Sequence, residues 1–117
     1  MTVETDLTAL LKTICTRTFP DFAPVGTARP YVTYQQIGGA APVFVDNTVP
    51  DTENGEFQIN VWADTRMQAK DLIKQIEAAL ILETQFQARP IGAAVSDFDA
   101  DVPVYGARQD FSIWSVR

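Results

Sequence analysis

The sequence predicts an α+β domain in which two amphipathic helices cover one face of an antiparallel sheet of about four strands. Two segments repeat apolar residues at the spacing of a helix, and others alternate apolar and polar residues as strands do. The segments follow one another in the order α-β-β-α-β-β. In a chain of 117 residues, this order predicts one domain over residues 1–117, with the apolar strand rows facing the helices.

The first predicted helix begins near Thr2 or Thr5, either of which can cap it, and ends before Pro20. A proline disfavours helical backbone in the residue before it, so the helix cannot run through this point. Cys15 lies on the apolar stripe, which favours a buried thiol over a nucleophile. The stripe has the helical spacing i, i+3, i+4, i+7, i+8 and consists of Leu7, Leu10, Leu11, Ile14 and Cys15.

The segment 31–38 is predicted to be a strand with polar residues on both faces. Thr33 and Gln35 share one parity, and Gln36 has the other. The long connection 39–55 contains two prolines and is expected to close with an Asn54–Gly55 turn. Loops of this length are usually functional or mobile, and we expect this one to be mobile in the isolated chain.

The segment "EFQINVWAD" alternates most regularly, and it predicts a strand that leads directly into the second helix. Asp64 or Thr65 can cap that helix, which is expected over 66–82. One face of the strand is apolar and should pack on the helices: Phe57, Ile59, Val61 and Ala63.

Two further strands are expected after Pro90, over 91–98 and 106–116, with an acidic turn between them. The first is weakly patterned because it contains small residues. The second has a clear apolar row, which consists of Ala107, Phe111 and Ile113.

Composition argues against several classes of function. The chain has a formal net charge of −6 and no histidine. Its basic residues are scattered, so a phosphate-binding surface is not expected. The commonest general base and metal ligand is missing, and no serine lies in a nucleophile elbow. We therefore expect no catalytic residue, cofactor or metal.

Three other kinds of feature are not supported by the sequence. Asp97, Asp99 and Asp101 resemble the start of a calcium loop, but Val102 replaces the required glycine and Arg108 replaces the closing glutamate. The N-terminus has no early basic residue, so we expect no signal peptide. No apolar run approaches the roughly 20 residues of a membrane helix, so we expect no membrane association.

The outward face of the predicted sheet carries the features that favour a binding role. Trp62 and Trp114 both have the parity opposite to the core rows. If their strands pair, the two rings could be neighbours on a face that no helix covers. Aromatic residues surrounded by polar groups are typical of protein interfaces. The equally weighted alternative is a small second core beneath the loop 39–55. The candidate interface residues are Trp62, Trp114, Gln35, Gln58, Asn60 and Phe44.

Three stretches also resemble a known family. They are "PYVTYQQIGG", "FQINVWADTRMQAKDLIKQIEAAL" and "YGARQDFSIW". Their order, with Pro-Tyr-Val before a polar strand, Val-Trp-Ala before a capped helix and Asp-Phe-Ser in the last strand, is similar to that of tail-completion and tail-terminator proteins of long-tailed phages and prophages. The resemblance covers nearly the whole chain, and its motifs are structural rather than catalytic.

The resemblance implies a ring, usually hexameric, at the head-proximal end of the virion tail, built from protein made in the bacterial cytoplasm. Such a ring caps the tail tube and joins it to the head connector. Its partners would be other copies of itself, the tail-tube protein and a head-completion protein. DNA would pass through the ring without specific binding, and acidic residues at the lumen would repel its phosphates. The candidate lumen residues are Asp97, Asp99, Asp101, Asp51 and Glu53.

Two other functions remain open at this point. The chain could be a monomeric adaptor that binds a protein partner through the exposed sheet face. It could also be a small enzyme, which the residue inventory supports least.

Overall fold

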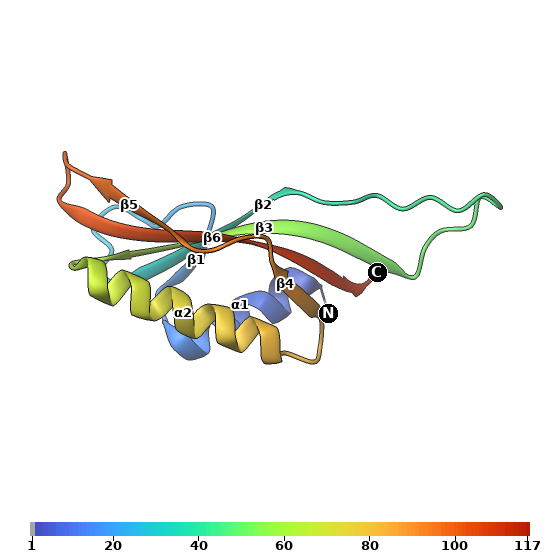
Figure 1. Cartoon of the computed structure of the whole chain (residues 1–117), viewed down its shortest axis with the longest axis horizontal. Coiled ribbons are helices and arrows are strands. Elements are labelled where there is room, and N and C mark those ends of the chain that lie inside the picture. Colours follow the sequence, from blue (N-terminus) through green and yellow to red (C-terminus); the bar gives the residue numbers. More distant parts are fainter. Residues whose placement is uncertain (1) are drawn as a thin grey trace.

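The computed structural model describes residues 2–117. Two helices lie on one face of a sheet, and the opposite face carries no helix (Figure 1). The predicted α+β class and the two-layer arrangement are therefore confirmed. In chain order, the elements are α1 (Val3–Ile14), β1 (Thr18–Pro20), β2 (Tyr31–Gly38), β3 (Thr52–Ala63), α2 (Arg66–Leu82), β4 (Gln87–Pro90), β5 (Val95–Asp99) and β6 (Val104–Val116).

The sheet has six strands in the order β1-β2-β3-β6-β4, and β5 also pairs with β6. β1 is parallel to β2, and all the other pairs are antiparallel. The expectation of about four strands, all antiparallel, was therefore wrong in number and direction. β1 and β4 are only three and four residues long and both end in proline. Edge positions tolerate proline, but such short segments show no period-two alternation in the sequence.

β4 and β5 form two parts of the same edge of the sheet. β4 pairs with residues 111–114 of β6 and β5 pairs with residues 104–108. The opposite side of β6 is occupied by β3 along its length. Between the two parts, residues 91–94 leave the ladder, although Ile91 N still donates to Asp110 O at 2.9 Å. The chain therefore bulges outward beside α2.

β3 and β6 form the centre of the fold. Phe57 faces Phe111, and Val61 faces Ala107. The apolar rows predicted for both strands are buried, as is the predicted thiol of Cys15. The helices contribute a matching apolar layer, which consists of Leu7, Leu11, Ala69, Ile73, Ile76 and Leu80.

Both helices begin at a threonine cap. Thr2 Oγ1 accepts a hydrogen bond from Thr5 N, and Thr65 Oγ1 accepts one from Gln68 N at 3.1 Å. α2 has the bounds that the sequence predicts. α1 is joined to the sheet by a hydrogen bond of 2.7 Å between Thr8 Oγ1 and Tyr34 Oη.

The connection between β2 and β3 is shorter than predicted because β3 begins at Thr52. Asn54 and Gly55 lie inside β3, opposite Trp114 and Ile113 of the long strand β6, so the expected turn at these residues was wrong. Residues 39–51, here called the arm, extend from one end of the sheet (Figure 1). The molecule is elongated, with extents of 53 × 25 × 23 Å.

Candidate functional site

The polar residues predicted on the outward sheet face come together in the structure. Gln35 of β2 lies directly opposite Gln58 of β3. Asn60 Nδ2 donates to Gln58 Oε1 at 3.4 Å. Thr33 pairs with Asn60 but is itself buried. This face therefore offers amide donors and acceptors from two neighbouring strands.

The two tryptophans do not meet on this face, contrary to expectation. Trp62 lies opposite Gly106, and Trp114 lies opposite Asn54. Asn54 and Trp62 are eight positions apart on β3, which at about 3.3 Å per residue separates the two sites by about 26 Å. The strands pair as predicted, but the register places the rings near opposite ends of the ladder.

Trp62 packs on the backbone of its own sheet. A Cβ atom added at Gly106 would lie 2.8 Å from Cζ3 of the Trp62 ring. The missing side chain of Gly106 therefore creates the space in which this ring lies. Trp114, by contrast, is 38% exposed, so of the two rings it is the better candidate for contact with another protein.

The arm carries apolar side chains that its own chain leaves uncovered. Phe44 is 49% exposed, and Val43 is 83% exposed. Val45 and Val49 are also exposed. Such a series of exposed apolar residues on a monomer is typical of a surface that another molecule covers.

The base of the arm is fixed to the sheet through Asn54. Ala40 N donates to Asn54 Oδ1 at 2.8 Å, and Asn54 Nδ2 donates to Ser112 Oγ at 2.9 Å. Gly39 has a φ of +149°, and a Cβ there would lie 2.4 Å from the Asn54 carbonyl oxygen. Only glycine fits this close approach, so the direction in which the arm leaves the sheet is set by the backbone.

The tip of the arm is a hydrogen-bonded turn. Asn47 N donates to Phe44 O at 3.1 Å, and Asn47 has a φ of 63°. Asp46 Oδ1 accepts from Thr48 Oγ1 at 2.7 Å and from Thr48 N at 3.1 Å. These bonds, first from the side chain and then from the backbone of Thr48, lower the pKa of Asp46 from its ordinary value of 3.8.

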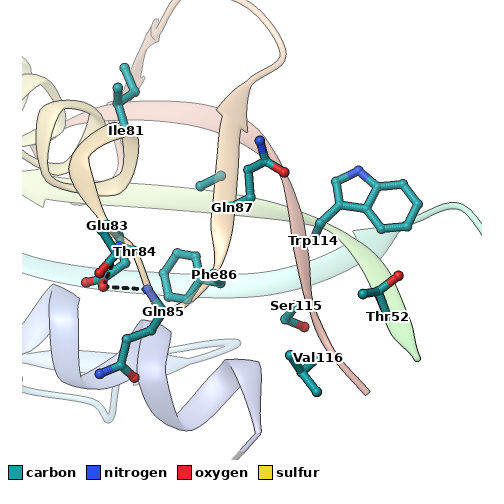
Figure 2. A pocket seen from close by; sticks show the side chains of 11 residues that line it. Thr52, Ile81, Glu83, Thr84, Gln85, Phe86, Gln87, Trp114, Ser115 and Val116 are labelled. Atoms are coloured by element: carbon teal, nitrogen blue, oxygen red, sulfur yellow. Dashed lines mark hydrogen bonds between the residues drawn. The ribbon is translucent and has the colours of Figure 1, made fainter. Parts of the chain in front are cut away.

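A shallow pocket of about 540 Å³ lies near the end of β6 that carries Trp114. Figure 2 shows Phe86 between β4 and the end of α2, with Trp114 and Val116 on the neighbouring strand β6. Glu83 Oε1 accepts from the backbone N–H groups of Thr84 and Gln85 and so holds the loop at its rim. The sequence gives no sign of this pocket because β4 carries no strand signal.

A second cavity, of about 240 Å³, lies between α2 and the bulge before β5. Gln109 lines it and is 3% exposed, although it occupies the apolar row of β6. A polar residue in an otherwise apolar strand row was the sequence signal for this site. The remaining lining includes Lys70, Ile73, Lys74, Glu77, Ala93, Ala94 and Val95.

The acidic residues proposed for a ring lumen lie in two separate places. Asp97 and Asp99 lie on β5, and Asp101 lies in the turn after it. Asp51 and Glu53 lie at the other end of the molecule, where the arm joins β3 (Figure 1). All five are exposed, and their place in an assembly stays a prediction.

In residues 2–117, no three acidic or cysteine side chains come together as metal ligands do. No helix in this range has the length and apolar character needed to cross a bilayer.

Comparison with known proteins gives one result for the whole chain. A family model described as "Tail completion protein gp17" matches residues 2–115. The search of curated proteins returned no match.

Proposed function

Because the chain belongs to the tail completion protein gp17 family of phages, we propose that it is a tail-terminator subunit, which caps the tail tube and joins it to the head connector as a ring. The observation that carries this proposal is the family match, which covers residues 2–115 and so includes every helix and strand except the last residue of β6. The family itself gives the coarser role, a structural part in completing the phage tail. The ring, the cap and the joint are the finer steps that we add.

The distribution of uncovered apolar side chains supports an assembled state. One set lies on the arm, and another surrounds Trp114 at the end of β6. A third set, which includes Val95 and Phe98, lies on β5. A subunit that contacts copies of itself, a tube and a connector needs several separate surfaces, and buried apolar area is the main source of their affinity.

We infer that the protein acts without catalysis and belongs to the virion, at the head-proximal end of the tail. Its partners in this proposal are its own copies, the tail-tube protein and a head-completion protein. DNA passes through the ring without specific binding. The net charge of −6 supports this, since negative side chains at a lumen repel phosphates.

The adaptor hypothesis loses its main support. It depended on adjacent tryptophans on the outward sheet face, and the register separates them. We therefore keep one proposed function.

Electron microscopy of tail tubes tests the proposal. Tubes of the parent phage are assembled without this protein and then incubated with it and with more tube protein. We expect one added density at a single end of each tube, no further elongation at that end, and recovery of head attachment. Tubes that keep growing at both ends and carry no added density would refute the proposed cap.

A further inference from the structure

We propose that the arm tip of one copy docks into the cavity between α2 and β5 of a neighbouring copy, in a head-to-tail contact. The docking segment is Val43–Asp46, and the cavity is the one lined by Lys70, Lys74 and Gln109. This inference rests on the proposed multi-copy role and names the surfaces through which the copies meet.

The arm does not reach this cavity in its own chain. Gln109 lies opposite Ile59, whereas the arm joins β3 at Thr52, seven positions away. At about 3.3 Å per residue, that step alone separates them by about 23 Å. The arm then continues away from the sheet (Figure 1). With the arm in this direction, the two surfaces meet only between different copies.

The cavity has an apolar floor and a net positive charge, since two lysines and one carboxylate, that of Glu77, line it. Ile73 and Ala107 contribute apolar surface. Lys70 and Lys74 are exposed, and in residues 2–117 neither has a carboxylate within 4.0 Å. Like charges four residues apart on one helix face repel each other, so an incoming carboxylate would relieve this repulsion.

The cavity also has an unused hydrogen-bond acceptor. Gln109 Nε2 donates to Glu77 Oε2 and to Gly92 O. Its Oε1 is buried and has no partner. An unpaired buried acceptor is costly, and a rotation of the Gln109 amide toward the cavity would let it accept from a main-chain N–H of an inserted segment.

The arm tip matches the apolar floor and the positive charge of the cavity. Val43, Phe44 and Val45 present apolar side chains, and Asp46 follows them directly with a carboxylate held by Thr48. The cavity of about 240 Å³ equals the volume of about eight waters at about 30 Å³ each, so it has room for an apolar side chain. Asp46 then reaches the lysine pair at the rim.

The other pockets lack a net positive rim that is free to meet Asp46. The charges of Arg108 and Asp110 cancel in one of them, and Asp6 and Glu83 make another acidic. The pocket beside Trp114 is lined by one charged side chain, that of Glu83, which would repel Asp46. In the pocket lined by residues 23–29, Arg29 is already paired with Asp64 at 3.0 Å. The cavity at α2 is therefore the docking site for the arm tip that the observations favour.

A head-to-tail contact has a consequence for assembly. The arm and the cavity are different surfaces, so each copy uses its arm on one neighbour and its cavity for the other. Such contacts either close into a ring or continue as a filament. The proposed contact is therefore of the kind from which the ring of the proposed function is built.

Disulfide trapping between two different variants tests this contact. One copy carries Phe44→Cys, a second carries Ala94→Cys, and both carry Cys15→Ser. The mixture is oxidised both free at high protein concentration and bound to tail tubes. We expect the mixed dimer to form at least about ten-fold more than with the matched control Phe22→Cys, because docked thiols react at a high effective concentration. Phe22 is exposed but lies outside the cavity.

A charge exchange between the two surfaces provides a second test. Asp46→Lys should reduce the mixed dimer to the control level, and the pair Lys70→Glu and Lys74→Glu in the second copy should restore it. Val43→Cys replaces Phe44→Cys if that variant misfolds by circular dichroism. Equal yields with Ala94→Cys and Phe22→Cys, both free and on tubes, would overturn the contact and indicate that the arm docks elsewhere.

The two proposals can fail separately. Tubes that are capped normally while trapping stays at the control level would reject the arm contact and leave the proposed function intact. Specific trapping by a protein that never caps tubes would reject the function and leave the contact.

Discussion

The contact between Trp62 and Gly106 shows how one missing side chain shapes the outward face. The ring of Trp62 lies over the Gly106 backbone, and a Cβ there would approach two ring atoms to 2.8 and 2.9 Å. Real side chains do not pack so closely, so either the ring or the strand has to move. Trp62 is therefore a packing residue of its own sheet as well as an interface candidate.

We predict that Gly106→Ala lowers the free energy of unfolding by about 1–3 kcal/mol, the usual cost of overpacking. Urea unfolding followed by circular dichroism measures it. The matched control is Gly38→Ala, where a Cβ would meet only the Glu56 side chain at 3.5 Å. Equal losses in the two variants would show that the ring contact is not the cause. Adding Trp62→Ala to Gly106→Ala should recover part of the loss.

A second residue-scale prediction concerns the arm tip and pH. The pKa of Asp46 is lowered from its ordinary value of 3.8, so ionised Asp46 stabilises the turn at any pH above 3.8. This stabilisation is lost as the pH falls through the lowered pKa. We expect the Thr48 amide resonance to titrate with a midpoint below 3.8. Thr48→Val removes the hydroxyl donor and should raise that midpoint, whereas Thr48→Ser should keep it low. An unchanged midpoint in Thr48→Val would contradict the assigned cause.

At the scale of elements, α2 is a helix whose position is determined by residues close to one another in the sequence. The sequence offers Asp64 or Thr65 as its cap, and in the structure Gln68 N donates to Thr65 Oγ1. Its buried face, which includes Ile73 and Ile76, then packs on β3 and β6. Both signals are local, so the sequence was sufficient to place this helix.

Thr65→Ala should therefore destabilise the protein by about 1 kcal/mol, because one N–H at the helix start loses its acceptor. Thr65→Ser keeps the oxygen and should stay close to the wild type. Chemical denaturation of the three proteins under the same conditions compares them. A Thr65→Ser variant as unstable as Thr65→Ala would argue against the capping bond as the source of the effect.

At the scale of the whole molecule, the apolar surfaces are spread along the 53 Å axis. Trp114 and the arm lie toward one end, and β5 lies toward the other (Figure 1). This spacing suits contacts with different neighbours at each end. It also means that one exposed side chain can matter for assembly without mattering for folding.

We predict that Trp114→Ala changes the free energy of unfolding by less than about 1 kcal/mol, as expected for a partly exposed side chain. The same variant should cap fewer tail tubes in electron micrographs, since its aromatic surface is available to a partner. Met67→Ala is the control, because Met67 is 77% exposed and lies outside the pocket beside Trp114. Normal capping by Trp114→Ala would remove this residue from the proposed interface.

Much of the candidate site could be read from the sequence as single residues but not as an arrangement. Gln35 and Gln58 were expected on one face, and the register brings them opposite each other. Trp62 and Trp114 were expected on the same face, but parity alone does not determine the position of either along the strand. The cavity at Gln109 was visible only as a polar residue in an apolar row, since α2 and the bulge that enclose it come from distant segments.

The sequence by itself determined both helices, the strand β2 and the apolar faces of β3 and β6, because their signals depend on residues within a few positions of one another. Only the tertiary structure decided the extra edge strands, the start of β3 at Thr52 and the register that separates the tryptophans. These features depend on hydrogen bonds between segments far apart in the chain. Local patterns cannot encode such pairing: a short edge strand forms only where a neighbouring strand offers its backbone.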